Sequence, residues 1–306
     1  MNKKVSPPLV IESIPKLHKH FGIKSPEHPL VSVVDLKDVP PCCGISDEAI
    51  SHHFYTISIK KNVKGKFRYG QQYYDFDKGV MTFLAPKQIL KIELENDSVG
   101  EGFMLYVHPD FFQKYPLAAK IKEYGFFSYA VNEALHLSET EDKMISKMFM
   151  DIRHEIHTSI DNFTQDLIVS YIDLLLNYSN RFYNRQFITR KVVNNDILVK
   201  LENLLHAYFN QNEFPEKGLP TVQYISEKLN ISPSYLSDML RHQTGMSTKH
   251  HIQNVLIEKA KEFLSITDLS ISEIAYMLGF EYPQSFNKLF KNKTNQTPLQ
   301  YRHSLN

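Results

Sequence analysis

Residues 270–297 read SISEIAYMLGFEYPQSFNKLFKNKTNQT, and residues 221–247, TVQYISEKLNISPSYLSDMLRHQTGMS, repeat the same pattern. In both segments apolar residues recur at helical spacing, a short break follows, and the helical spacing then resumes. Each segment therefore predicts one helix, a short turn and a second helix. The first helix should end at a residue that tolerates a left-handed backbone, which is Asn230 in one segment and Gly279 in the other.

The second helix of each pair has matching end signals. It opens with Pro233 or Pro283, and proline is favoured at the first position of a helix. It should end at Gly245 or Asn295, two residues that accept a left-handed cap. The segment 248–264 between the pairs has one apolar face and predicts a helix that joins them.

A helix, a short turn and a helix describes a helix-turn-helix unit, whose second helix can enter the major groove of DNA. The alternative is an all-α bundle or a protein-binding module in which the helix pairs only pack. One pair alone would leave that alternative open. Two pairs in the same order, joined by a helix, favour DNA binding.

The two pairs differ in charge. Residues 196–306 contain as many acidic as basic residues, but no acidic residue lies between Tyr282 and Arg302. The basic residues of that stretch are Lys288, Lys291, Lys293 and Arg302. We expect the second pair to attract phosphates, and the first pair to depend more on hydrogen bonds from Ser234 and Ser237.

The first third of the chain is typical of β-structure. Segments rich in β-branched and aromatic residues predict five strands, at 31–36, 54–59, 80–84, 89–94 and 102–107. No helical pattern lies between them, which favours an antiparallel sandwich or barrel.

Two amphipathic helices follow the strands. The apolar spacing in 145–156 and in 163–178 predicts an antiparallel helix pair with a turn at 161–162. Residues 181–195 are polar and basic, and we predict a solvated link between domains there.

Composition excludes several classes of protein. A formal net charge of +1 excludes a protein that coats nucleic acid by bulk charge. The two cysteines, Cys42 and Cys43, are adjacent, which excludes a disulfide framework or a four-cysteine zinc site and is typical of a cytoplasmic protein. Residues 1–14 have no apolar segment of sufficient length before Pro7 and Pro8, so we expect no signal peptide. The most apolar stretch, 167–178, is interrupted by Ser170 and Asp173, so we expect no membrane span.

The last third of the chain resembles the DNA-binding domain of the AraC-type (AraC/XylS) bacterial transcription regulators. The resemblance is carried by Ile274-Ala275-Tyr276-Met277-Leu278-Gly279-Phe280, Ser285-Phe286, Phe290-Lys291, Thr297-Pro298 and Tyr301-Arg302. Two positions depart from the family pattern: Asn295 stands where glycine is usual, and Leu256 where the joining helix often carries arginine.

The resemblance implies DNA-contacting residues on the exposed face of each second helix. These are Ser234, Ser237, Asp238, Arg241, Gln284, Asn287, Lys288 and Lys291. Gln284 and Asn287 are the strongest candidates for reading sequence, because an amide side chain can form paired hydrogen bonds with adenine.

The N-terminal part resembles the cupin-like barrel with which many members of this family sense a small molecule. The similar stretches are 67–70, 75–79 and 83–86. The resemblance implies a sensor domain at 1–136, a helical hairpin for dimerisation with a linker at 137–190, and a DNA-binding domain at 191–306. Aromatic residues that could line a ligand pocket are Tyr55, Phe67, Tyr69 and Tyr74.

The sequence therefore predicts a mixed fold: an antiparallel cupin-like β-barrel with following helices, then an all-α domain with two helix-turn-helix units. The predicted function is a sequence-specific transcription regulator, an activator controlled by a small molecule or by dimerisation. Its expected partners are double-stranded DNA, a second copy of the chain, a small-molecule effector and RNA polymerase.

The alternative is a cupin-like metal enzyme fused to a helical module that tethers it to DNA. Such an enzyme needs converging histidine and carboxylate ligands, but His52 and His53 are adjacent and would point to opposite faces of a strand. The sequence has no nucleophile elbow, phosphate-binding loop or paired catalytic carboxylates. We therefore expect no enzyme activity, no metal and no cofactor.

Overall fold

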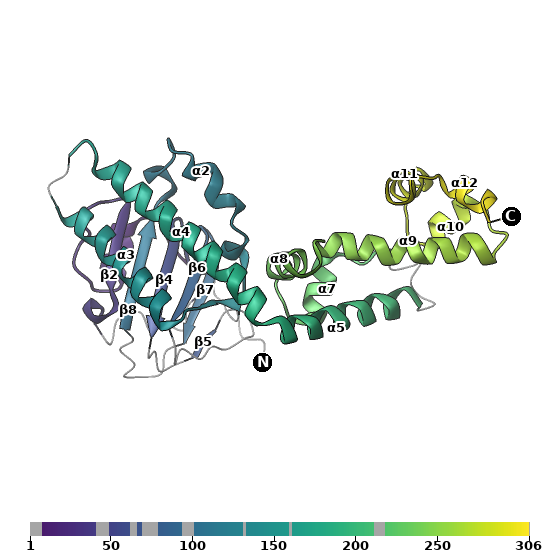
Figure 1. The fold of residues 1–306 in the computed structure, drawn as a ribbon. Helices are drawn as coiled ribbons and strands as arrows, with labels where there is room; N and C mark the ends of the chain where they lie inside the picture. The colour runs from purple at the N-terminus through teal and green to yellow at the C-terminus, as the bar shows by residue number, and fades with distance from the viewer. Residues whose placement is uncertain are drawn as a thin grey trace, which may run out of the picture. The chain divides into compact units, whose positions relative to one another are not determined.

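The fold is described from a computed structural model, which covers residues 8–40, 49–61, 66–68, 79–93, 101–130, 133–158, 161–210 and 218–305. The chain divides into an N-terminal unit, Met1–Ile188, and a C-terminal unit, Thr189–Asn306. Figure 1 shows strands flanked by helices in the first unit and helices in the second. The predicted mixed fold is confirmed.

Two sheets form the N-terminal unit. One has five strands in the order β2-β8-β4-β6-β9, and the other has four in the order β1-β3-β7-β5. The strands are β1 (Leu9–Ile11), β2 (Val31–Asp35), β3 (Ala49–His52), β4 (Tyr55–Lys61), β5 (Lys66–Arg68), β6 (Val80–Leu84), β7 (Ile89–Glu93), β8 (Glu101–Val107) and β9 (Leu135–His136). All pairings are antiparallel except β1 with β3. The five predicted strands are confirmed.

The five-stranded sheet has two chemically different faces, because side chains alternate along a strand. On β4, Ile57 and Ile59 share a face with Phe103 of β8, whose ring stacks on Phe149 at 6.0 Å between centroids. On the opposite face, the hydroxyls of Ser58 and Thr82 lie 2.6 Å apart. The helices therefore cover an apolar face, and the other face carries polar groups.

The helices of the N-terminal unit include the predicted hairpin. They are α1 (Ile14–His20), α2 (Leu117–Lys120), α3 (Glu139–His157) and α4 (Thr164–Thr189), with 3₁₀ turns at Leu36–Asp38, Pro109–Phe111, Ile121–Glu123 and Gly125–Ser128. Ser138 and Glu141 form a capping box at the start of α3. The predicted turn residue Asp161 accepts from the backbone N–H groups of Phe163 and Thr164 at 2.8 and 2.9 Å.

The boundary between the two units, after Ile188, falls inside the predicted link at 181–195. The expectation that this segment is solvated is wrong. This segment is helical, because α4 continues to Thr189 and α5 (Lys191–Asn210) begins directly after Arg190. Phe182, Tyr183 and Phe187 are buried. Their apolar surface outweighs the basic composition of the stretch, since burying such a side chain stabilises by about 1.5–3 kcal/mol.

Two polar side chains of α4 hold strand β9. The amide of Gln186, which is 1% exposed, accepts from the His136 N–H at 2.9 Å and donates to the Ala134 carbonyl at 3.1 Å. Arg185 donates to the His136 carbonyl at 2.8 Å and to Glu141 at 2.6 Å. The backbone groups on the outer side of β9 are thus satisfied by side chains.

The C-terminal unit is built from helices. They are α5, α7 (Val222–Leu229), α8 (Pro233–Thr244), α9 (Thr248–Ile266), α10 (Ile271–Met277), α11 (Pro283–Thr294) and α12 (Pro298–His303). Helix α9 contacts each of the other helices except α7 at several positions. Among the described residues of the whole chain, no helix is long and apolar enough to cross a membrane.

Candidate nucleic-acid interface

The turns of the two helix pairs have the backbone geometry that the sequence predicted. Asn230 follows α7 with φ 55°, and Gly279 follows α10 with φ 76°. Both second helices begin with proline at the first position. They end at left-handed caps, Gly245 with φ 77° and Asn295 with φ 61°. Asparagine therefore performs the glycine role at 295.

The inner face of each second helix forms the local core. Leu236 and Leu240 of α8 are 0% exposed, and so are Phe286 and Phe290 of α11. The rings of Phe286 and Phe290 contact each other at 5.7 Å between centroids. Met239 of α8 is buried as well. This burial fixes the rotation of each helix, so Ser237 and Asp238 on α8, and Asn287 and Lys288 on α11, lie on the outer face.

The outer face of α11 presents four of the predicted DNA-contacting residues. Gln284, Asn287, Lys288 and Lys291 are all exposed. Neither lysine forms an ion pair with any residue that the structure describes. This face therefore offers two amide groups for base edges and two cations for phosphates.

The outer face of α8 is chemically different. Ser234 is half-buried and Arg241 is exposed. The Ser237 hydroxyl lies 3.0 Å from that of Thr248, a residue that is 0% exposed. Arg241 donates to Asp238 at 2.9 Å. Two of the four predicted contacts on α8 are thus paired with each other, and a third holds the start of α9.

Two basic residues of the acid-free stretch point inward, which corrects their expected role as phosphate-attracting groups. Lys293 donates to the side-chain oxygen of Asn254 in α9 at 3.0 Å. Arg302 donates to the carbonyls of Leu264 and Leu269 at 3.3 and 2.7 Å, across the end of α9. Only Lys288 and Lys291 of the four lie on the outer face.

Helix α9 joins the two pairs, as predicted. Its 19 residues correspond to a length of about 28 Å. Ile252, Leu256, Ala260 and Leu264 are buried and form its apolar face. Leu256 lies in the core, so leucine at this position fits the packing of the joining helix.

Sequence reasoning missed three parts of this unit. Helix α5 packs on α7, α8 and α9, and Tyr208 of α5 donates to the Gly218 carbonyl at 3.0 Å. Helix α12 packs on α9 and α11, and its capping box at Thr297 and Gln300 was a readable signal. Asn254 also donates to the Met246 sulfur at 3.3 Å, a contact for which the sequence holds no signal.

One titratable group supports the first helix pair. The His251 ring lies 2.9 Å from the Thr244 hydroxyl, near the cap of α8. Desolvation lowers the pKa of His251, although Glu202 acts in the opposite direction. The neutral imidazole is therefore the form that this packing favours.

The aromatic residues predicted to line a ligand pocket are only partly described. Tyr55 is 9% exposed, and its ring contacts Phe127 at 5.0 Å and Phe112 at 5.8 Å. Phe67 lies on β5, but its side chain, together with Tyr69 and Tyr74, falls outside the described residues. A ligand pocket at these four residues stays a prediction.

The histidine considered as a metal ligand has a structural environment. His52 is 5% exposed, and its two ring nitrogens lie 2.8 Å from the Phe54 carbonyl and 3.2 Å from the Thr56 hydroxyl. Its ring stacks on Phe54 at 4.5 Å. Among the described residues, no group of three or more histidine, cysteine or acidic residues is placed to hold a metal ion.

Two family models match this chain. A helix-turn-helix domain model matches residues 225–304, and an AraC-like ligand binding domain model matches residues 49–170. An uncharacterized HTH-type transcriptional regulator of Staphylococcus aureus is 24% identical over 227 residues, which are 73% of this chain and 28% of that protein. The chain thus spans about a quarter of the length of such curated relatives.

Solved structures resemble the C-terminal unit. The C-terminal domain of AraT, a response regulator from Geobacillus stearothermophilus, is 32% identical, covering 35% of this chain and 84% of that one, with a TM-score of 0.31. The DNA-binding domain of AdpA, a global transcriptional factor solved with a target DNA, is 19% identical, covering 35% and 90%, with a TM-score of 0.30.

Proposed function

The chain belongs to the AraC family of bacterial transcription regulators, and from that premise we propose that it is a sequence-specific DNA-binding regulator acting in the cytoplasm. Its C-terminal unit binds the operator. Its N-terminal unit, which matches the AraC-like ligand binding domain, receives the signal.

One observation carries this proposal: two matching helix pairs on a shared helix, each with a 12-residue second helix whose outer face stays free of the core. A major groove about 12 Å wide admits such a helix. Gln284 and Asn287 then read base edges, and Lys288 and Lys291 contact phosphates. With α9 about 28 Å long and successive grooves about 34 Å apart, binding both units at once favours some bending of the duplex.

We further propose that the protein is a homodimeric activator. Leu167 and Leu174 lie one above the other on α4 and are 46% and 43% exposed, and Phe163 just before the helix is 67% exposed. A second copy of the hairpin would remove this apolar surface from water. A small molecule bound to the N-terminal unit would shift the equilibrium between DNA-competent and incompetent arrangements, and contact with RNA polymerase would follow on the DNA.

Genome-wide footprinting with the purified full chain tests the proposal. We expect a small number of sites with a shared sequence, and affinity for them that falls steeply as salt rises. The Lys288→Ala and Lys291→Ala double variant should lose most of that binding. Binding that ignores salt, or an absence of any protected site in the genome, would reject DNA recognition by this surface.

A further inference from the structure

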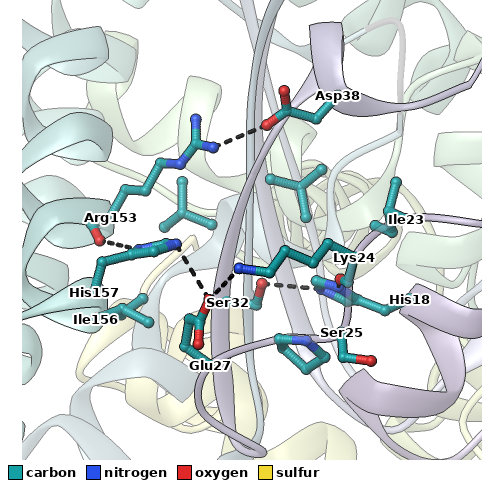
Figure 2. A pocket seen from close by; sticks show the side chains of 13 residues that line it. His18, Ile23, Lys24, Ser25, Glu27, Ser32, Asp38, Arg153, Ile156 and His157 are labelled. Carbon is teal, nitrogen blue, oxygen red and sulfur yellow. Dashed lines mark hydrogen bonds and ion pairs between the residues drawn. The ribbon is translucent and has the colours of Figure 1, made fainter.

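A cavity of about 370 Å³ lies outside the β-sandwich, between strand β2, the loop after α1 and the last turns of α3. Figure 2 shows Lys24 entering it from the loop and Arg153 from α3. Its volume falls within the range of small-molecule sites, which begins at about 300 Å³. None of the residues predicted to bind a ligand lines it.

The wall formed by β2 offers backbone hydrogen bonds. Among the strands that the structure describes, β2 lies at the edge of its sheet and pairs with β8 alone. The His108 N–H donates to the Leu30 carbonyl at 2.8 Å, and bonded and non-bonded pairs alternate along an antiparallel ladder. Val33, opposite Leu105, therefore belongs to a non-bonded pair, and its N–H and C=O point away from β8.

These two backbone groups of Val33 have no hydrogen-bond partner among the residues that the structure describes. Val33 is nevertheless only 6% exposed, and it lines the cavity. An unpaired N–H and C=O with so little access to water are costly unless something else bonds to them. The cavity thus presents an adjacent donor and acceptor, as the edge of a sheet does to an added strand.

Charges of both signs flank this backbone. The Arg153 guanidinium donates to Asp38 at 2.8 Å, and its other terminal nitrogen lies 3.8 Å from the Asp35 carboxylate. The hydrogen bond to Asp38 uses one of its five N–H groups. Glu27 accepts from Lys24 at 2.8 Å, and the His157 ring lies 4.0 Å from it. The Asp38 side chain is 57% exposed, and such surface ion pairs contribute little, so a ligand carboxylate can compete for Arg153.

The remaining lining is mixed. His18, Ser25 and Ser32 are polar, and the His18 ring lies 2.9 Å from the Ser32 hydroxyl. The apolar part is aliphatic. Ile23 and Pro26 come from the loop, and Ile156 from α3. Ile156 is 6% exposed. The cavity therefore has an aliphatic surface on one side and paired charges on the other. These features favour a ligand that has an aliphatic side chain and charged groups of both signs.

We propose that this cavity binds a free α-amino acid with an aliphatic side chain. The ligand acts as a single residue added to the edge of β2: its carboxylate accepts from the Val33 N–H and from Arg153, and its ammonium donates to the Val33 C=O and to Glu27. Its side chain packs on Ile23, Pro26 and Ile156. This assignment does not depend on DNA binding.

The test uses the full chain and the twenty standard amino acids, screened by thermal shift and then measured by calorimetry. We expect an aliphatic amino acid such as L-leucine to bind with a Kd below about 1 mM. 4-Methylpentanoate, which lacks the ammonium group, and leucinamide, which lacks the carboxylate, should each bind about tenfold more weakly or worse.

Variants locate the site. Arg153→Met should weaken amino-acid binding by about tenfold or more, and Glu27→Gln by about threefold to tenfold. Arg181→Met is the matched control, because Arg181 is exposed on α4 and does not line the cavity, and it should leave binding unchanged. Circular dichroism checks that each variant folds. If Arg153→Met unfolds, Glu27→Gln still tests the site, because the Glu27 side chain is 42% exposed and its substitution should not disturb folding.

The proposal fails if none of the twenty amino acids binds at 10 mM, or if Arg153→Met and Glu27→Gln both bind like the parent chain. Duplex binding is measured in parallel on the same samples. DNA binding without amino-acid binding would reject this cavity and leave the proposed function intact. The reverse result would support the cavity and reject the regulator.

Discussion

The two helix pairs of the C-terminal unit have the same backbone conformation, but the side chains on their outer faces differ. Helices α8 and α11 have the same length, the same proline start and the same left-handed end. On α8, Asp238 pairs with Arg241, whereas on α11 Lys288 and Lys291 are exposed in a stretch without acidic residues. The repeated features are the ones that folding requires, and the features that differ lie on the outer faces that we propose contact DNA.

This difference indicates that the two helix pairs contribute unequally to DNA binding. The first pair is tied into its unit through Ser237 and Thr248, so its outer face has fewer groups available for DNA. The second pair holds its tethered basic residues on the inner side and leaves amides and lysines outside. We therefore expect α11 to supply more of the affinity and of the sequence preference.

The largest expected effect separates two glycines that follow different helices: Gly279 follows the first helix of the second pair, and Gly245 follows the second helix of the first pair. Both Gly245 and Gly279 have positive φ, but a Cβ on Gly279 would lie 2.9 Å from the Gly218 carbonyl carbon, whereas a Cβ on Gly245 meets nothing within 4 Å. Gly245→Ala should lower the free energy of unfolding by about 1–2 kcal/mol through backbone strain alone. Gly279→Ala should cost at least about 3 kcal/mol, because the Gly218 backbone must also move.

Urea unfolding of the full chain, followed by helical circular dichroism, measures both glycine variants. Equal losses would mean that the close approach of Gly218 to Gly279 is easily relaxed. In that case alanine would cost the same unfolding free energy at Gly245 and at Gly279.

The next effect concerns reading of sequence. Gln284→Ala should lower affinity for the preferred operator by about 1–3 kcal/mol and leave affinity for unrelated duplexes nearly unchanged. Ser234→Ala at a matching place on α8 should have a smaller effect. Fluorescence anisotropy with operator variants measures this, and a uniform loss on every duplex would remove Gln284 from the residues that read sequence.

A smaller effect distinguishes the cations of the two pairs. Lys291→Ala should weaken binding to every duplex by a similar factor, and it should reduce the slope of log affinity against log salt by about 0.9. Arg241→Ala should change that slope less, because Arg241 already donates to Asp238 at 2.9 Å. A larger change for Arg241 than for Lys291 would reverse the assignment of the main phosphate contact to the second pair.

The smallest effect is a pH dependence confined to the first pair. Burial lowers the pKa of His251 in the folded chain, so the unfolded chain binds more protons as the pH falls. The stability that His251 contributes is therefore present above about pH 6.5 and is lost as the pH falls below that value. The loss should be small, because this site is only half-buried and solvent screens it.

Hydrogen exchange of the α8 amides between pH 5.5 and 7.5 detects this loss after correction for intrinsic rates. His251→Gln should flatten the profile, whereas His303→Gln, at an exposed position in α12, should leave it unchanged. A profile that survives His251→Gln would assign the pH dependence to another group.

Local features of the fold could be predicted from the sequence. The caps at Asn230, Gly279, Gly245 and Asn295 follow from which residues tolerate positive φ, and each is found as predicted. The buried faces of α8 and α11 follow from apolar spacing. These features can be predicted because the residues that determine a cap or a buried face lie within one or two helical turns of it.

Features that depend on distant partners could not be predicted. Strands β1, β3 and β9 are two to four residues long, and pairing with other strands stabilises them more than their own composition does. The basic residues near Arg302 in the sequence predict a phosphate-attracting cation, but the acceptors of Arg302 are carbonyls more than 30 residues earlier in the chain. Likewise, Ser237 has its partner on the following helix.

The contact of Gln186 with strand β9 affects how the chain aggregates at high protein concentration. An open strand edge can recruit another chain and seed aggregation. The side chains of Gln186 and Arg185 form hydrogen bonds with the outward backbone groups of β9, so this edge of the five-stranded sheet cannot pair with another strand. Among the described strands, growth of the five-stranded sheet into fibres or inclusion bodies would therefore start at the β2 edge, and an occupied β2 edge would improve solubility during overexpression.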